Sequence, residues 1–283
     1  MNYQKALFEG NKFLKRNNII NFNLDSELIL SKVLKKSREE ILTNLNDRIR
    51  TKEFDEFNFH LKRRGNKEPI AYILGYKYFW KYKFLVNKSV LIPRPETEEL
   101  IEEALKYIAN NKSKKILDIG TGSGCIIISI LKDRPKCIGT AIDICNNALK
   151  VAKTNAKLHH LRNKIKFINI DIDKYNSNKY DLILSNPPYI SDISLIRLDK
   201  DVKQFEPKLA LSGGISGYKS IKKVIKKSKK LLKNNGKLII EIGDTQKSQT
   251  IDFLKINGFY INKIGKDLSM KDRFIVSTKI KNA

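Results

Sequence analysis

The stretch KKILDIGTGSGC, residues 114–125, joins a short apolar run to three glycines at alternate positions. The apolar run predicts a buried strand, and the apolar residues that follow the glycines predict a helix. Gly120, Gly122 and Gly124 let the backbone turn tightly and let a ligand approach it closely. Their spacing differs from the dinucleotide fingerprint G-x-G-x-x-G, and the P-loop signature is absent. On these residues alone, a plain strand-to-helix turn remains the alternative to a ligand-binding loop.

The sequence around this stretch repeats the alternation of strand and helix. Apolar runs rich in Ile, Leu and Val are separated by segments of helical length. The predicted strands are 114–120, 137–143, 164–171, 180–188, 236–243, 260–265 and 273–280. Helices between strands require right-handed crossovers, so we predict an α/β domain with a mostly parallel, seven-stranded sheet covered on both faces. Ligands bind such sheets beyond the carboxyl ends of the strands.

Two further segments precede this domain. Residues 1–68 carry only helical patterns, with Ser37 and Glu40 at capping-box spacing, and predict a small all-helical domain for recognition or scaffolding. Residues 69–92 are rich in aromatic and β-branched residues and predict a β-hairpin-like connector. The predicted α/β domain then comprises residues 93–283.

Acidic residues close the first three predicted strands of the α/β domain. Asp118 lies just before the glycines, and Asp143 closes the second strand, where its carboxylate can accept hydrogen bonds from both hydroxyls of a ribose. Asp171 closes the third strand, where its carboxylate or the following backbone can meet an adenine amine. Because no lysine lies near the glycines, this set favours a nucleoside that carries a positive centre over a triphosphate.

The fourth predicted strand ends in SNPPYI, residues 185–190. Two consecutive prolines remove two backbone donors and stop the pairing of the sheet. Asn186 can accept a hydrogen from a planar NH2 group through its side-chain oxygen, and the backbone carbonyl of Pro187 can accept the second. These contacts would orient the group and stabilise charge developing on its nitrogen. Tyr189 can flank a planar group by stacking. For this motif taken alone, a Pro-Pro turn without chemistry is the alternative.

Composition bears on partners and compartment. The chain has 283 residues, 41% of them hydrophobic, and a formal net charge of +26, which makes contact with nucleic acid possible. The excess charge is mostly lysine spread along the chain, so such contact is not required. Three cysteines form neither a disulfide pattern nor a metal pattern, so we expect no metal and a cytoplasmic location. We also expect no membrane span and no signal peptide, because apolar runs are short and the N-terminus is polar.

The chain resembles a known class of enzymes through LDIGTGSG, AID and NPPY, namely the class I S-adenosylmethionine-dependent methyltransferases that act on planar nitrogen. It is similar to the PrmC (HemK) family of peptide chain release factor glutamine methyltransferases through EPIAYILGYKYFW, LIPRPETEEL, DVKQFEPKLAL and GKDLSMKDRFIVS. This resemblance covers nearly the whole chain from about residue 20. It implies a Rossmann-like class I fold, and methyl transfer to the glutamine of the Gly-Gly-Gln motif in class I release factors. Some relatives carry a second, transfer-RNA methyltransferase domain, which we do not expect in this chain.

The resemblance also implies which residues form the site. The residues expected to bind S-adenosylmethionine are Gly120, Thr121, Gly122, Ser123, Gly124, Asp143, Ile172 and Asn186. The residues expected to hold the substrate glutamine are Asn186, Pro187, Pro188 and Tyr189, with Asn186 also the catalytic residue. Ile172 stands where the family often has a Trp that packs on adenine. The helices of residues 1–68 would contact the release factor, and the connector with Phe79 and Trp80 would position the two domains.

Two other functions stay open at this point. A nucleic-acid methyltransferase would use the same NPPY chemistry on the exocyclic amine of adenine or guanine, and the basic charge suits it. However, no insertion of the size of a target-recognition region interrupts the α/β domain. A binding or assembly module would keep the fold without activity, and the intact glycine loop, Asp143 and Asn186 argue against that reading.

Overall fold

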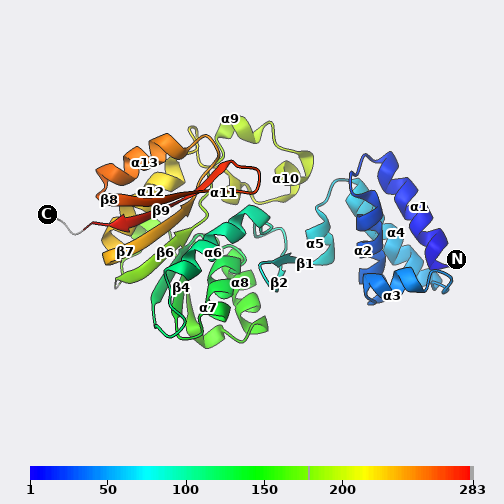
Figure 1. Ribbon diagram of the computed structural model, residues 1–283. Helices are drawn as coiled ribbons and strands as arrows, with labels where there is room; N and C mark the ends of the chain where they lie inside the picture. The colour runs from blue at the N-terminus through cyan, green and yellow to red at the C-terminus, as the bar shows by residue number, and fades with distance from the viewer. Residues whose placement is uncertain (178, 281–283) are drawn as a thin grey trace. The chain divides into compact units, whose positions relative to one another are not determined.

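The computed structural model describes residues 1–177 and 179–280 (Figure 1). The chain divides into two compact units. They are the helical unit, Met1–Tyr76 with Asp199–Phe205, and the α/β unit, Lys77–Leu198 with Glu206–Ala283. The helical unit thus runs further than the 1–68 expected from the sequence, and it takes in a short segment from the later part of the chain. Among the described residues, no helix is long and apolar enough to cross a membrane.

The helical unit contains one apolar core formed by short helices. The helices are α1 Tyr3–Arg16, α2 Phe22–Leu34, α3 Arg38–Thr43, α4 Thr51–Gly65, α5 Ile70–Leu74 and α10 Lys200–Phe205. Leu14 of α1, Leu30 of α2 and Phe57 of α4 are fully buried in this core. Burial of apolar residues on α1 to α5 holds elements too short to be stable alone, whereas α10 has no buried residue.

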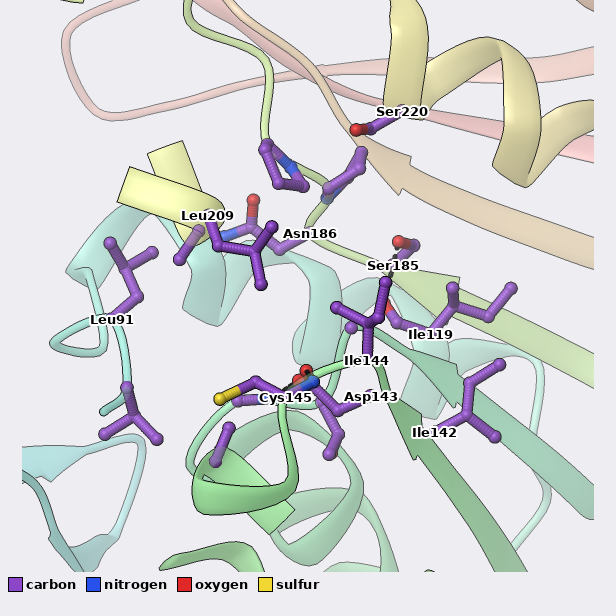
Figure 2. A pocket seen from close by; sticks show the side chains of 18 of the residues that line it. Leu91, Ile119, Ile142, Asp143, Ile144, Cys145, Ser185, Asn186, Leu209 and Ser220 are labelled. Atoms are coloured by element: carbon purple, nitrogen blue, oxygen red, sulfur yellow. Dashed lines mark hydrogen bonds between the residues drawn. The ribbon is translucent and has the colours of Figure 1, made fainter. Parts of the chain in front are cut away.

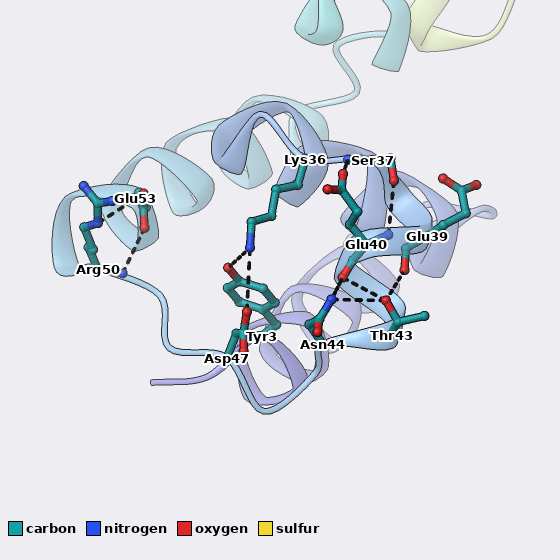
Figure 3. Close-up of polar contacts among 10 residues, drawn as sticks. All are labelled: Tyr3, Lys36, Ser37, Glu39, Glu40, Thr43, Asn44, Asp47, Arg50 and Glu53. Carbon is teal, nitrogen blue, oxygen red and sulfur yellow. Dashed lines mark hydrogen bonds and ion pairs between the residues drawn. The ribbon is translucent and has the colours of Figure 1, made fainter.

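Side-chain caps fix the starts of two of these helices. Asn2 precedes α1, and its side chain accepts a hydrogen bond from the backbone N–H of Lys5 at 2.9 Å. Ser37 and Glu40 form the predicted capping box at α3, as Figure 3 shows. Ser37 Oγ accepts from the backbone N–H of Glu40 at 3.1 Å, and Glu40 Oε2 accepts from the backbone N–H of Ser37 at 2.6 Å. Each bond satisfies a backbone donor that has no partner inside the helix.

The α/β unit is built on one large sheet. In the part of the chain that the structure describes, this sheet has seven strands in the order β5-β4-β3-β6-β7-β9-β8. The strands are β3 Lys115–Ile119, β4 Ile138–Asp143, β5 Ile165–Asn169, β6 Tyr180–Ser185, β7 Leu232–Glu241, β8 Phe259–Lys266 and β9 Asp272–Lys279. The first five run parallel to one another, and β9 pairs antiparallel with both β7 and β8. The mostly parallel, seven-stranded sheet predicted from the sequence is confirmed.

Helices cover both faces of this sheet (Figure 1). The helices and helical turns of the unit are η1 Pro95–Thr97, α6 Glu98–Lys106, α7 Cys125–Asp133, α8 Asn146–Leu158, η2 Arg162–Lys164, η3 Ile172–Lys174, α9 Asp192–Leu195, α11 Lys208–Leu211, α12 Lys219–Leu231 and α13 Lys247–Ile256. The core on one face includes buried residues of α6, α7 and α8. The core on the other face includes buried residues of α12 and α13. The strand order reverses at β3, because β4 and β5 lie on one side of it and β6 and β7 on the other, so a ligand site is expected beyond the carboxyl ends of these strands.

Helix α12 contains the longest lysine-rich run. Its buried residues form one stripe at helical spacing, namely Ile221, Val224, Ile225, Ser228 and Leu231. The lysines take the remaining, exposed or half-buried faces. Helix packing therefore explains the spacing of the apolar residues in this run.

The hairpin is shorter than the expected connector of residues 69–92. The first part of that segment is helix α5, which lies between Pro69 at its start and Gly75 at its end. Gly75 has φ 85°, a left-handed conformation that glycine adopts readily, and this ends the helix before the hairpin begins. The hairpin itself pairs β1 Tyr76–Phe79 with β2 Tyr82–Leu85.

The side chains of the hairpin pack into the α/β unit. Phe79 and Phe84 are fully buried, with ring centroids 6.0 Å apart, in the core that also holds α7. Trp80 Nε1 and Tyr82 Oη both donate to Asp133, at 3.0 and 2.7 Å, at the end of α7. The expected role of Phe79 and Trp80 in positioning the two domains stays a prediction.

Candidate active site

A cavity of about 480 Å³ opens at the predicted edge of the sheet (Figure 2). Its lining includes Ile119 at the end of β3, Asp143 at the end of β4 and Asn186 just after β6. Figure 2 shows Asp143 and Asn186 reaching the cavity from the ends of two different strands. Because β3 and β6 are parallel neighbours, the glycine loop after β3 and the NPPY motif after β6, far apart in the sequence, reach one site.

The glycine loop forms the wall of the cavity after β3. Gly120, Gly122 and Gly124 have φ values of 73°, 55° and 81°, which L side chains rarely adopt. A Cβ atom built on Gly120 or Gly122 would meet nothing within 4 Å, so the backbone there is open to a ligand. Gly124 differs, because a Cβ atom there would lie 3.0 Å from Ile128 and 3.2 Å from Ala152. Two of the three glycines thus keep space for a ligand, and the third allows α7 to pack closely.

The two remaining residues of the loop, Thr121 and Ser123, are buried and line the cavity. Thr121 Oγ1 donates to Asp118 Oδ2 at 2.7 Å. The backbone carbonyl of Ser123 accepts from Asn155 Nδ2 at 2.9 Å, and Asn155 also bonds both backbone groups of Leu85 in the hairpin, at 2.7 and 3.0 Å. The loop is therefore held from β3 and from α8, and Asn155 joins it to the hairpin.

Asp118 is fully buried beneath the loop. Its Oδ1 atom has no hydrogen-bond partner among the described residues. Burial raises the pKa of Asp118 to about 7, against the hydrogen bond from Thr121, and the nearby Asp143 carboxylate adds to the rise. A buried acceptor without a partner next to a ligand loop is a feature that a bound ligand or water can satisfy.

Asp143 organises the cavity as well as lining it. Its Oδ2 accepts from the backbone N–H of Gly122 at 2.9 Å, and its Oδ1 accepts from the backbone N–H of Cys145 at 2.8 Å. Burial raises the pKa of this carboxyl, and these backbone hydrogen bonds oppose the rise. Because each carboxylate oxygen can accept a second hydrogen bond, acceptor capacity remains for the two hydroxyls of a ribose.

The next strand supplies an apolar wall. Ile170 and Ile172 line the cavity, together with Asp171 between them. The Asp171 carboxylate is already engaged, because Oδ1 accepts from the backbone N–H of Asp173 at 2.9 Å and Oδ2 lies 3.7 Å from Lys223 Nζ. Ile172 therefore lines the cavity together with Asp171, and its adenine contact stays a prediction.

The NPPY motif is only partly on the cavity wall. Asn186, Pro187 and Pro188 line the cavity, whereas Tyr189 is not among the lining residues in the described chain. The Tyr189 ring packs against the core next to α12, and its hydroxyl donates to Glu241 Oε1 at 3.4 Å. The expected stacking of Tyr189 on the substrate is not supported by this arrangement.

Sequence reasoning missed the residues that lie behind Asn186. Asn186 Nδ2 donates to Thr97 Oγ1 at 3.1 Å, and Thr97 Oγ1 donates to Glu241 Oε2 at 2.7 Å. Glu241 is 2% exposed and ends β7. Burial raises its pKa to about 7, although the Thr97 hydrogen bond and the charge of Arg273 oppose the rise. The available signal was a single acidic residue in the otherwise apolar run LIIEIG.

The structure also brings together LIPRPETEEL and DVKQFEPKLAL. Arg94 from the first and Glu206 from the second form an ion pair, and Glu206 Oε2 accepts from the backbone N–H of Ile92 at 3.3 Å. Arg94 and Pro207 both line the cavity. These two stretches therefore form adjoining parts of its wall.

Two sequence families match this chain. Residues 5–75 match the family described as PrmC N-terminal domain, and residues 99–199 match the family described as methyltransferase small domain. The first match lies within the helical unit and the second within the part of the chain that carries the glycine loop and the NPPY motif.

Curated relatives match over most of the chain. A release factor glutamine methyltransferase from Buchnera aphidicola is 38% identical over 257 residues, covering 91% of this chain and 92% of that protein. One from Clostridium acetobutylicum is 35% identical over 282 residues, covering 99% of both. A bifunctional methyltransferase from Rickettsia bellii is 36% identical over 299 residues, covering 96% of this chain. The chain spans about half, 54%, of the length of this last relative.

Solved structures agree on the fold. The structure of a methyltransferase from Pyrococcus furiosus superimposes with a TM-score of 0.53 at 16% identity, covering 70% of this chain and 89% of that chain. With the matching methyltransferase family, this likeness shows that the α/β unit has the class I S-adenosylmethionine-dependent methyltransferase fold.

Proposed function

Since this chain belongs to the release factor glutamine methyltransferase family, we propose that it methylates the glutamine of the Gly-Gly-Gln motif in class I peptide chain release factors. The methyl donor would be S-adenosylmethionine, and the acceptor would be the nitrogen of the glutamine side-chain amide. The observation that carries the proposal is that the glycine loop and Asn186 line one cavity. A donor bound at the loop would therefore lie next to an amide held by Asn186.

The chain's own residues suit S-adenosylmethionine. The open backbone at Gly120 and Gly122 leaves room for the methionine part, and the Asp143 carboxylate has capacity for the ribose hydroxyls. Ile172 offers an apolar surface to the adenine, where it would pack without the stacking that a Trp provides. When bound, the cofactor supplies a methyl group on a positively charged sulfur, and no metal is needed for that chemistry.

The remaining residues would act on the substrate amide. An amide nitrogen is a poor nucleophile because its lone pair is delocalised, as the rotation barrier of about 18–20 kcal/mol indicates. Asn186 Oδ1 and the backbone carbonyl of Pro187 would accept the two N–H hydrogens, which orients the nitrogen and stabilises positive charge on it. Pro187 and Pro188 fix the backbone so that these two acceptors keep their positions.

We further propose that the helical unit contacts the release factor. The match of residues 5–75 to the PrmC N-terminal domain supports a role for the helical unit that is separate from methyl transfer. The activity would take place in the cytoplasm, where translation terminates.

A test of the proposal compares three acceptors with one methyl donor. The purified protein is incubated with radiolabelled S-adenosylmethionine and with a class I release factor, total RNA or duplex DNA. We expect label in the release factor, and none in a release factor whose Gly-Gly-Gln glutamine is replaced by alanine. Label in RNA or DNA alone would instead support methylation of nucleic-acid amines and would overturn the proposal.

A further inference from the structure

The hydrogen bonds behind Asn186 run in one direction. Glu241 and Thr97 are 2% and 3% exposed, so water does not compete for their polar atoms. They come from strand β7 and turn η1, and they meet Asn186 just after β6. Three segments that are distant in the sequence therefore converge on one side-chain amide.

The chemistry of each group fixes this direction. An ionised carboxylate can only accept, so the Thr97 hydroxyl must give its single hydrogen to Glu241 Oε2, at 2.7 Å. The Thr97 oxygen can then only accept from Asn186, which selects the NH2 end of the amide at 3.1 Å. The opposite end, Oδ1, accepts no hydrogen bond from the described residues, and Asn186 lines the cavity. The acceptor that the reaction needs is thus the end left for the substrate.

We propose that Thr97 and Glu241 are positioning residues that hold the Asn186 amide in the orientation that presents Oδ1 to the substrate NH2. The proposal rests on the proposed function and adds two residues to it, namely Thr97, which also lines the cavity, and Glu241, which is not among the lining residues in the described chain. We call the two hydrogen bonds from Asn186 to Thr97 and from Thr97 to Glu241 the relay. A flip of the Asn186 amide would turn its NH2 group toward the NH2 group of the substrate. The relay disfavours this flip, because Thr97 has no hydrogen left to donate to Oδ1.

The direction of the relay depends on the charge of Glu241. Arg273, which is paired with Asp267 at 2.7 Å, favours the ionised form, and the Thr97 and Tyr189 hydroxyls also donate to it. Burial and the nearby Glu96 carboxylate favour the neutral form, and together these effects raise the pKa of Glu241 to about 7. A neutral Glu241 can donate a hydrogen bond to Thr97. The Thr97 hydroxyl can then donate to Asn186 Oδ1, and the preference for one orientation of the Asn186 amide is lost.

Three variants test the relay. Thr97→Val keeps the shape and removes the hydroxyl, Thr97→Ser restores the hydroxyl, and Glu241→Gln keeps the shape without the charge. Thr154→Val is the matched control, because its exposed hydroxyl bonds the backbone of α8 at 2.9 Å, away from the cavity. We expect Thr97→Val to lower kcat by about 100-fold, as for misplacement of a reacting group, with the affinity for S-adenosylmethionine within about threefold. Thr97→Ser should recover most of the rate.

The pH profile separates positioning from general structural damage. The kcat of the wild-type protein should rise as Glu241 ionises, near pH 7, and Glu241→Gln should lose this rise and keep a low, pH-independent rate. Asp118 is a second buried carboxyl with a pKa of about 7, so its ionisation could also make kcat rise with pH. We expect Asp118→Asn to keep this rise, which would exclude Asp118 as its cause. The proposal would be overturned if Thr97→Val kept the wild-type kcat, or if Glu241→Gln kept the wild-type pH profile. If Thr97→Val does not fold, the pH profile of Glu241→Gln decides. All variants are compared on the acceptor that the wild-type protein methylates. If that acceptor is not the release factor glutamine, the proposed function is refuted, but the relay can still be tested.

Discussion

Replacement of Asp143 by alanine tests the cofactor half of the site most cleanly. The substitution removes the two oxygens that accept from Gly122 N–H at 2.9 Å and from Cys145 N–H at 2.8 Å. It also removes the proposed acceptor for two ribose hydroxyls. A hydrogen bond to a charged group contributes about 1.5–3 kcal/mol, so two such bonds give roughly 3–6 kcal/mol. Water admitted through the open cavity offsets part of this, and we expect a net loss of about 3 kcal/mol, or more than 100-fold in Kd.

Isothermal titration calorimetry with S-adenosylmethionine measures this loss directly. Asp252→Ala is the matched control, because Asp252 is exposed on α13 and does not line the cavity. Burial raises the pKa of Asp143, so the affinity of the wild-type protein should also weaken as the pH falls through that pKa and a carboxylate acceptor is lost. A Kd for Asp143→Ala within threefold of the wild-type value would refute the ribose role.

Three further predictions concern neighbouring residues. Asn186→Ala should abolish methyl transfer while S-adenosylmethionine binding, followed by calorimetry, stays largely in place; equal loss of both would show a cofactor-binding or folding role. Asp118 has a folded-state pKa of about 7, above the unfolded value near 4, so its contribution to stability is present below about pH 4 and is lost as pH rises to 7. In urea unfolding, Asp118→Asn should therefore gain stability relative to the wild-type protein between pH 4 and pH 8, by roughly 3 kcal/mol or less, and a pH-independent difference would contradict the shift. Asn155→Ala leaves buried backbone groups of Leu85 and Ser123 without partners and should cost about 3 kcal/mol in unfolding free energy, together with weaker cofactor binding; unchanged stability would show that water replaces the side chain.

The site residues that could be predicted from the sequence are those that belong to short motifs at the ends of strands. Gly120 and Gly122 follow a strand and Asp143 ends one, and runs of apolar residues indicate both strands in the sequence. Parallel strands bring their carboxyl ends to one edge of the sheet. Asn186 belongs to the same class, because two prolines mark where its strand must stop. For these residues, local pattern and sheet topology lead to the same place.

The parts that were not predictable depend on long-range packing. Thr97 and Glu241 are 144 residues apart and meet only after the sheet has formed. Tyr189 lies beyond Pro188, where strand alternation no longer indicates the direction of a side chain, and its hydroxyl turned out to bond Glu241. The sequence pattern assigns residues 70–74 to the hairpin-like connector with the aromatic and β-branched residues that follow them. Instead, the flanking Pro69 and Gly75 and the burial of Ala71 and Ile73 select a short helix.

The most direct test of the central claim locates the methyl group on one atom. The wild-type protein and Asn186→Ala are each incubated with S-adenosylmethionine and an unmodified class I release factor, and the release factor is digested and sequenced by tandem mass spectrometry. We predict one methyl group on the side-chain nitrogen of the Gly-Gly-Gln glutamine with the wild-type protein and none with the variant. A wild-type protein that leaves this glutamine unmodified, while it methylates another residue or a nucleic acid, would contradict the account.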